Sequence, residues 1–297
     1  MLVSNSPRLW TALITPFKED LSIDFESLER LLLRQQRAKL GVLLCGSTGE
    51  ALNLSLEKKK SIIDFSLSLK LKIPYMIGVG GHLLEEQIKW IQFLEKYQSI
   101  HSYLLVTPLY SKPGPLGQTA WFKSLLSVAT KPSILYNIPS RTGVELAIQT
   151  VQELNTHPLV WGIKEASGEP HKFSQYQEAL SNGIIFSGDD MLMKEFSKRG
   201  AFGLISVASN IWPERTQDFL TKCLEQTLNT EDNQKFVSCF SELFKSSNPL
   251  PTKALLAYKK IIKTYQTIPP LTSTDFNSMS SLLKWDSWIT NLKGEKK

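Results

Sequence analysis

The chain has 297 residues, of which 42% are hydrophobic and 21% charged, a composition typical of a globular protein with a large core. Its formal net charge of +6 lies in short lysine clusters. These clusters do not alternate with stacking aromatic residues, so we expect no nucleic-acid partner. The sequence has no apolar stretch of transmembrane length and no signal peptide, which excludes a membrane protein and predicts the cytoplasm.

Cysteines and histidines give no support for a metal site. The chain has Cys45, Cys223, Cys239, His82, His101, His157 and His171. None of them shows the spacing of metal ligands, and three cysteines are poor support for a disulfide framework. We expect Cys45 to be a small buried hydrophobe and the histidines to lie on the surface or in loops. No metal or cofactor is expected.

Short apolar runs alternate with longer amphipathic runs along the chain. Strands are predicted at residues 9–15, 40–45, 75–79, 102–106, 133–136, 160–164, 184–186 and 203–206. Helices are predicted at residues 24–38, 55–69, 83–97, 116–129, 146–154, 171–180 and 190–199, with Asp24 and Ser55 as N-caps. No glycine-rich dinucleotide or Walker motif follows a strand. Eight such repeats predict a (β/α)₈ barrel rather than an open sheet.

The pattern becomes purely helical after residue 206. Helices are predicted at residues 211–227, 231–244, 251–264 and 274–291. This is more chain than one barrel helix requires. We therefore predict a barrel over residues 1–223 and a C-terminal helical subdomain over residues 224–297.

Lys164 ends a predicted buried strand, where a charged ammonium group is costly unless it is paired or neutral. A neutral lysine amine can attack a carbonyl carbon and form a Schiff base. Taken alone, Lys164 is better explained by pairing with a nearby carboxylate. Its neighbours at the other strand ends favour the catalytic interpretation, because a barrel gathers these ends at one mouth.

Hydroxyl groups and one guanidinium occupy those strand ends. The turn at residues 46–50 (Gly-Ser-Thr-Gly-Glu) presents backbone N–H groups suited to a carboxylate. Arg141 offers a fork for a second carboxylate, although pairing with Glu145 is an alternative. Tyr136, Tyr110 and Ser47 are able to relay a proton if they lie within hydrogen-bond reach. Simple turn capping by Ser47 and loop packing by Tyr110 stay open.

Several motifs in order resemble one family, the pyruvate-dependent class I lyases typified by dihydrodipicolinate synthase and N-acetylneuraminate lyase. They begin at residues 12–17 (Ala-Leu-Ile-Thr-Pro-Phe), 46–50, 106–108 (Val-Thr-Pro), 136–139 (Tyr-Asn-Ile-Pro) and 162–165 (Gly-Ile-Lys-Glu). They continue at residues 187–190 (Ser-Gly-Asp-Asp), 205–207 (Ile-Ser-Val) and 248–253 (Asn-Pro-Leu-Pro-Thr-Lys). The resemblance spans most of the chain.

The resemblance implies a role for each matching residue. Lys164 would form the imine with pyruvate, and Tyr136 would shuttle protons through Ser47 to Tyr110, which reaches in from a neighbouring subunit. Ser47 and Thr48 would hold the pyruvate carboxylate. Gly188 and Ile205 stand where the family places backbone carbonyls near the substrate. The family also suggests a homotetramer built as a dimer of dimers.

Arg141 distinguishes two branches of the family. Residues 139–143 (Pro-Ser-Arg-Thr-Gly) resemble the synthase branch, whose Arg receives the carboxylate of aspartate semialdehyde. Pyruvate and aspartate semialdehyde are thus the expected substrates, in diaminopimelate and lysine biosynthesis. An aldol-cleaving lyase acting on a sialic acid or sugar-derived oxo-acid is the alternative, and a non-catalytic oxo-acid sensor is a third interpretation.

Two departures from the synthase pattern have consequences. Ser47 stands where a threonine is usual, so the relay hydroxyl is retained with a less restrained rotamer. In the lysine-binding pocket that the family resemblance implies, Leu109, Leu56 and His82 replace tyrosine, histidine and asparagine, while Glu86 remains. We therefore expect weak or absent feedback inhibition by lysine.

Overall fold

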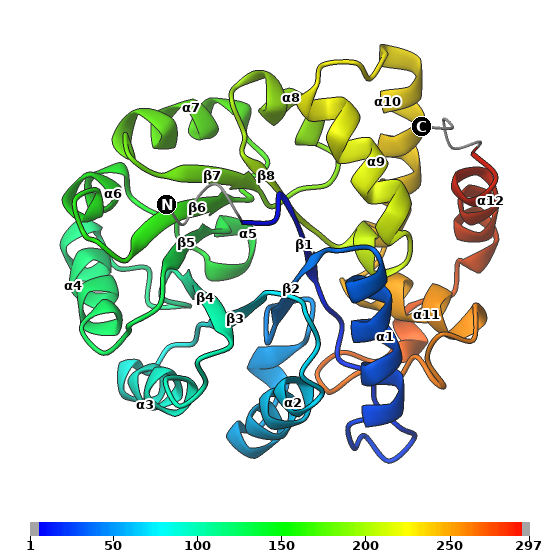
Figure 1. Cartoon of the computed structure of the whole chain (residues 1–297), viewed down its shortest axis with the longest axis horizontal. Helices are drawn as coiled ribbons and strands as arrows, with labels where there is room; N and C mark the ends of the chain where they lie inside the picture. Colours follow the sequence, from blue (N-terminus) through cyan, green and yellow to red (C-terminus); the bar gives the residue numbers. More distant parts are fainter. Residues whose placement is uncertain (1–5, 293–297) are drawn as a thin grey trace.

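Eight parallel strands form a closed barrel in the computed structural model, which describes residues 6–292. The strands are β1 (Leu9–Ala12), β2 (Gly41–Leu44), β3 (Tyr75–Val79), β4 (Ile100–Val106), β5 (Ser133–Asn137), β6 (Val160–Glu165), β7 (Ile184–Ser187) and β8 (Gly203–Ser206). Each strand pairs with its neighbours in chain order, and β8 closes against β1 (Figure 1). The predicted (β/α)₈ barrel is confirmed.

Helices surround the barrel and extend beyond it on one side (Figure 1). They are α1 (Phe25–Arg37), α2 (Leu56–Ser68), α3 (Leu84–Leu94), α4 (Pro115–Leu126), α5 (Pro139–Thr142), α6 (Ile148–Leu154), α7 (Pro170–Ala179), α8 (Met193–Lys198), α9 (Pro213–Leu224), α10 (Thr230–Ser241), α11 (Leu250–Tyr258) and α12 (Met279–Thr290). None of these described helices is long and apolar enough to cross a bilayer.

Both predicted N-caps are confirmed. The Asp24 carboxylate accepts a hydrogen bond from Ser27 N at 3.1 Å, and the Ser55 hydroxyl accepts one from Lys58 N at 3.2 Å. Each cap satisfies a backbone donor that the first helical turn leaves free. The apolar faces behind these caps pack in the core between the helices and the strands.

Three predicted helices are clearly wrong in extent. The helix predicted over 274–291 begins only at Met279. The helix predicted over 251–264 ends at Tyr258, because Lys260 takes a left-handed conformation with φ 55° and turns the chain back. The helix predicted over 190–199 begins only at Met193. Asp190 is not helical, since its buried carboxylate accepts hydrogen bonds from the Ser206 hydroxyl and, at 2.9 Å, from Val207 N.

Aromatic rings fill the end of the barrel at which the strands begin. Trp10, His101 and Trp161 are each the second residue of their strand, and their ring centroids are 5.4 and 5.5 Å apart in turn. Trp161 also contacts Phe186, as its prediction as a core residue implied. The expected surface or loop position is wrong for His101, because the alternation of β4 directs its ring into the barrel. This packing leaves the other end as the open mouth.

Helices α10, α11 and α12 lie together on one side of the barrel, next to α1 and α9 (Figure 1). They form the helical region that the sequence predicts after the last strand. The proposed boundary between residues 223 and 224 falls within the final turn of α9, Pro213–Leu224, and stays a prediction. Residues 293–297, part of the predicted subdomain, lie outside the described residues.

Candidate active site

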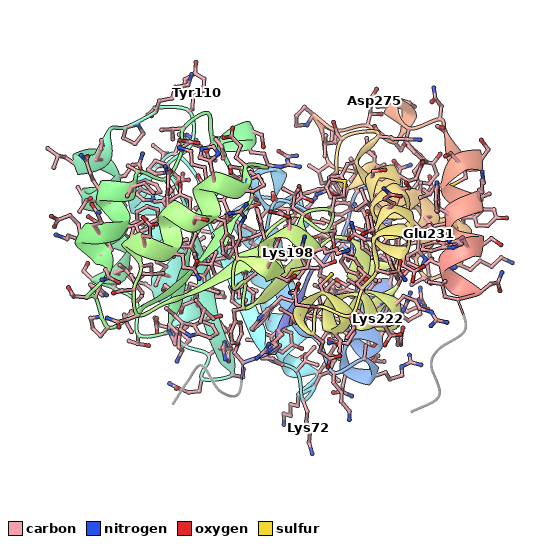
Figure 2. All side chains as sticks on the ribbon, turned by 90° about the horizontal axis from the view of Figure 1, so that it is seen from above. Lys72, Tyr110, Lys198, Lys222, Glu231 and Asp275 are labelled. Carbon is pink, nitrogen blue, oxygen red and sulfur yellow. The ribbon has the colours of Figure 1, made fainter. Side chains whose placement is uncertain are left out.

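The strand ends and the loops that follow them lie on one face of the molecule. Figure 2 shows Tyr110 and Asp275 on this face and Lys72, which precedes β3, on the opposite one. Tyr110 follows β4, so this face is the mouth of the barrel. In such barrels the reactive groups gather at this end.

Lys164 and Tyr136 lie side by side at the mouth. They are paired residues on the neighbouring strands β6 and β5, and both side chains are buried. The Lys164 Nζ atom lies 4.3 Å from the centroid of the Tyr136 ring. Within residues 6–292 no carboxylate pairs with Lys164 and no hydrogen bond reaches its Nζ. The alternative of a lysine paired with a carboxylate is therefore not what the structure contains.

Gly188, at the end of β7, is packed against the Lys164 side chain. A Cβ atom at Gly188 would lie 2.8 Å from Lys164 Cε and 2.7 Å from Ala166 Cβ, closer than van der Waals contact allows. Gly188 N donates to Glu165 O at 2.7 Å, which fixes this approach. The absence of a side chain at Gly188 thus lets the stem of the lysine lie against the barrel wall.

Glu165 follows Lys164 and points away from the barrel interior, as strand alternation requires. Its carboxylate accepts hydrogen bonds from Asn137 Nδ2 and Ser167 N, both at 2.7 Å. Burial raises the pKa of Glu165, and the hydrogen bonds from Ser167 and Asn137 oppose that shift. Glu165 is thereby held on the outer side of the strand, where it does not neutralise Lys164.

The turn at residues 46–50 follows β2 at the mouth of the barrel. Ser47 is half-buried, and Thr48 is buried with its hydroxyl accepting a hydrogen bond from Asn248 Nδ2 at 2.9 Å. Ser47 lines the same small cavity as Tyr136. Within the described chain no hydrogen bond joins the Ser47 and Tyr136 hydroxyls, and the relay between them stays a prediction.

Arg141 lies on the short helix α5, directly after β5, and its guanidinium is exposed. The alternative pairing with Glu145 does not occur, because Glu145 accepts a hydrogen bond from Lys172 Nζ at 2.9 Å. Arg141 lines the small cavity of Tyr136 and also a cavity of about 530 Å³ beside it. Ser47 lines both as well. The larger cavity is open to solvent and suits a second small molecule.

Tyr110 is not brought to the other site residues within one chain. Its side chain is 92% exposed and projects from the mouth (Figure 2). Its backbone is left-handed, with φ 67°, and Tyr110 N donates to Thr142 O at 3.3 Å. The loop is therefore fixed to the end of α5 while the phenol faces outward.

Ile205 is buried inside the barrel on β8, and its backbone is paired with Trp10 of β1. Asp190 lies behind it and binds the next two residues, Ser206 and Val207, at the end of the strand. Burial raises the pKa of Asp190 to about 6. The sequence motif included Asp190 without assigning it this contact, which links the ends of β7 and β8.

Residues of the C-terminal region also reach the site, and the sequence analysis gave them no role. Asn248 contacts Thr48, and Lys253 forms a salt bridge with Glu50 in which both side chains are fully buried. The signal was present in the motif at residues 248–253. Nothing local in this motif indicated that the Asn248 and Lys253 side chains contact the turn at residues 46–50.

Cys45 lines the small cavity but is a buried, free cysteine, as predicted. Burial raises the pKa of its thiol to about 12, so it is a poor nucleophile. No three His, Cys, Asp or Glu side chains gather as metal ligands in the part of the chain that the structure describes. The candidate nucleophile is Lys164, whose amine lies against the ring of Tyr136, a residue that lines this cavity.

Comparisons with known proteins agree with this arrangement. The model of the Dihydrodipicolinate synthetase family matches residues 5–284. The 4-hydroxy-tetrahydrodipicolinate synthase of Francisella tularensis subsp. novicida is 41% identical over 289 residues, covering 97% of this chain and 98% of that protein.

Solved structures of similar proteins share the fold. The 4-hydroxy-tetrahydrodipicolinate synthase of Methylacidiphilum fumariolicum SolV is similar with a TM-score of 0.86 and 31% identity, over 96% of each chain. The dihydrodipicolinate synthase of Acinetobacter baumannii, solved in complex with pyruvate, gives a TM-score of 0.83 at 29% identity, over 96% of this chain and 97% of that one. The chain therefore belongs to the dihydrodipicolinate synthetase family.

Proposed function

We propose that this protein is a 4-hydroxy-tetrahydrodipicolinate synthase, a lyase that condenses pyruvate with aspartate semialdehyde through a Schiff base on Lys164. The observation that carries the proposal is the position of the Lys164 amine, which is buried at the barrel mouth against Tyr136 with no carboxylate partner in the described chain. An amine held in this way is available to attack a carbonyl carbon. The product would serve diaminopimelate and lysine biosynthesis.

The first half of the reaction joins pyruvate to the enzyme. The Lys164 amine attacks C2 of pyruvate, and loss of the C2 oxygen as water leaves an imine. The turn at residues 46–50 holds the pyruvate carboxylate through Ser47 and Thr48, with Gly188 and Ile205 lining the opposite side through their backbones. Removal of a methyl proton then gives the enamine, and the Tyr136 hydroxyl is the nearest candidate to move protons in these steps.

The second half uses the aldehyde. The enamine carbon attacks the aldehyde carbon of aspartate semialdehyde, and the aldehyde oxygen takes up a proton to become the hydroxyl of the product. Arg141 binds the carboxylate of this substrate from the rim of the larger cavity. The substrate amine then attacks the imine carbon, which closes the ring and releases Lys164 as a free amine.

The proton relay requires a second subunit. Tyr110 projects from its own chain, so its hydroxyl reaches Ser47 and Tyr136 only if a neighbouring subunit supplies it. Leu116 and Leu83, near the same mouth, are 87% and 48% exposed. A second copy of this chain covering these side chains would remove apolar area from water. A homotetramer, assembled as a dimer of dimers in the cytoplasm, is the proposed working form.

Borohydride trapping tests the imine. Pyruvate and borohydride are added to the folded protein, and peptides are mapped by mass spectrometry. A reduced pyruvate adduct on Lys164 is the expected result, and the Lys164→Arg variant should give none. Absence of an adduct in folded wild-type protein would refute the Schiff-base mechanism, whichever aldehyde is the second substrate.

The second substrate is tested with Arg141→Ala. Turnover of aspartate semialdehyde should fall about 100-fold through loss of a bidentate carboxylate contact, while pyruvate trapping on Lys164 stays unchanged. Arg37→Ala, at the exposed end of α1, is the matched control. The similar proteins above are named as synthases, so the aldol-cleaving lyase is not favoured. If the protein cleaved N-acetylneuraminate faster than it condensed pyruvate with aspartate semialdehyde, the lyase would become the favoured function.

A further inference from the structure

The turn at residues 46–50 is not stabilised by its own sequence alone. Cys45, directly before it, and Glu50, at its end, are non-glycine residues in the left-handed region, with φ 54° and 57°. Such residues favour other conformations unless surrounding contacts hold them. The local contacts are backbone hydrogen bonds: Glu50 N donates to Ser47 O at 3.0 Å, Ala51 N to Gly46 O at 3.3 Å and Asn53 N to Glu50 O at 2.9 Å. From outside the turn, the Thr15 hydroxyl donates to Gly49 O at 2.7 Å.

Glu50 is held in this conformation by the C-terminal region. Its carboxylate accepts a hydrogen bond from Lys253 Nζ on α11 and another, at 2.8 Å, from Ile268 N. Lys253 Nζ also donates to Gln266 O at 2.8 Å and lies 4.1 Å from the centroid of the Phe17 ring. Burial lowers the pKa of Lys253 to about 8 and raises that of Glu50, and in each case the partner's charge opposes the shift.

A second contact reaches the same turn independently. Asn248 Nδ2 donates to the Thr48 hydroxyl at 2.9 Å, and both residues are buried. Thr48 lies two residues before Glu50, so the C-terminal region holds the turn at two points. These two points flank Gly49, whose backbone carbonyl is bound by Thr15.

We infer that Lys253 and Asn248 are positioning residues for the site, which through Glu50 and Thr48 hold the turn at residues 46–50 in the shape that binds the carboxylate of pyruvate. The inference rests on the proposed function, because it takes that carboxylate to bind at this turn. Neither residue needs to touch the substrate. Their effect is to prearrange hydroxyl and backbone N–H groups before the substrate arrives, which lowers the cost of binding.

A positioning role and a contribution to stability alone predict different results when the pair is replaced. Replacing a buried ion pair by uncharged side chains of similar size is often neutral or stabilising, whereas removing one partner is costly. A pair kept for stability alone would therefore be replaceable without a change in pyruvate binding. If the pair sets the conformation of Glu50, its replacement should change pyruvate binding. Methionine at position 253 and glutamine at position 50 would remove the ion pair that joins α11 to the turn.

The decisive experiment uses the double variant Glu50→Gln/Lys253→Met, which leaves no unpaired charge in the core. The concentration of pyruvate that gives half-maximal trapping on Lys164 is measured, together with kcat at saturating pyruvate. We expect the half-saturating concentration to rise about tenfold, in the range found for residues of one contact network, with kcat within about twofold of wild type. Lys259→Met/Asp286→Asn, which removes another ion pair of the C-terminal region, is the matched control and should change neither value.

The outcomes separate the two proposals. No adduct in wild-type protein refutes the proposed function itself. An adduct in wild type with the same half-saturating concentration in the double variant overturns the positioning role and leaves the function intact. If the double variant does not fold, Asn248→Ala replaces it, because this change breaks the contact to Thr48 without burying a charge. An unchanged pyruvate dependence in that variant would equally overturn the inference.

Discussion

Lys164 and Lys253 are both buried lysines of the same chain, and their surroundings differ in the one respect that matters for chemistry. Lys253 is bound by the Glu50 carboxylate and the Gln266 carbonyl, so its amine is fully occupied. Lys164 contacts the face of the Tyr136 ring and has no carboxylate partner among the described residues. Burial alone therefore does not identify a nucleophile. The absence of a carboxylate partner, next to a tyrosine that lines a cavity, does.

Replacing Lys164 gives the largest expected effect. Lys164→Met should lower kcat by about 10³-fold or more, because it removes the amine that forms the imine. Its free energy of unfolding should stay within about 1 kcal/mol of wild type, since a buried side chain without a carboxylate partner is exchanged for an apolar chain of similar length. Initial rates and urea unfolding measure the two quantities. Lys89→Met, an exposed change on α3, is the control.

The same substitution at Lys253 should behave differently. Lys253→Met leaves the Glu50 carboxylate buried and unpaired, and we expect the free energy of unfolding to fall by about 3 to 5 kcal/mol. Adding Glu50→Gln should restore most of this loss. Urea unfolding of both single variants and the double variant gives the coupling energy. A single variant as stable as wild type would erase the contrast between the two lysines.

A buried carboxylate extends the comparison to pH. Asp190 has its pKa raised to about 6 by burial, above the ordinary value of 3.8. The folded state therefore takes up this proton at higher pH than the unfolded state, and the cost of the buried charge is relieved as pH falls from about 6 to about 4. The difference in free energy of unfolding, wild type minus Asp190→Asn, should therefore rise by up to about 3 kcal/mol as the pH falls over this range. Urea unfolding at pH 7 and pH 4 tests the sign.

Lysine should have the smallest effect. The family resemblance implies an inhibitor pocket in which Leu109, Leu56 and His82 replace polar or aromatic residues, so a lysine ligand would lose hydrogen-bond partners. Initial rates of condensation should be unchanged at physiological lysine concentrations. Clear inhibition would contradict this prediction and would show that other residues bind lysine.

Local signals predicted most of the barrel. The apolar runs and the caps at Asp24 and Ser55 indicated the elements directly, because capping and periodicity depend on residues close in sequence. The end of α11 at Tyr258 was missed because the following turn has no glycine: Lys260 takes the left-handed conformation instead. The returning chain is then bound to the barrel by the Thr264 hydroxyl, which donates to Phe17 O at 2.8 Å.

The candidate site also has a part that the sequence predicts and a part that only the tertiary structure decides. The sequence by itself determined which strand ends carry Lys164, Tyr136 and Arg141, since the order of strands in a barrel follows the order of the chain. Tertiary structure alone decided which of the buried amines is free. The contact between Glu50 and Lys253 joins residues 203 positions apart, and a pairing at that distance leaves no periodic trace in the sequence. Tertiary structure also decided that the Tyr110 side chain faces away from its own barrel. The exposure of a side chain depends on how its loop packs rather than on which residues compose the loop.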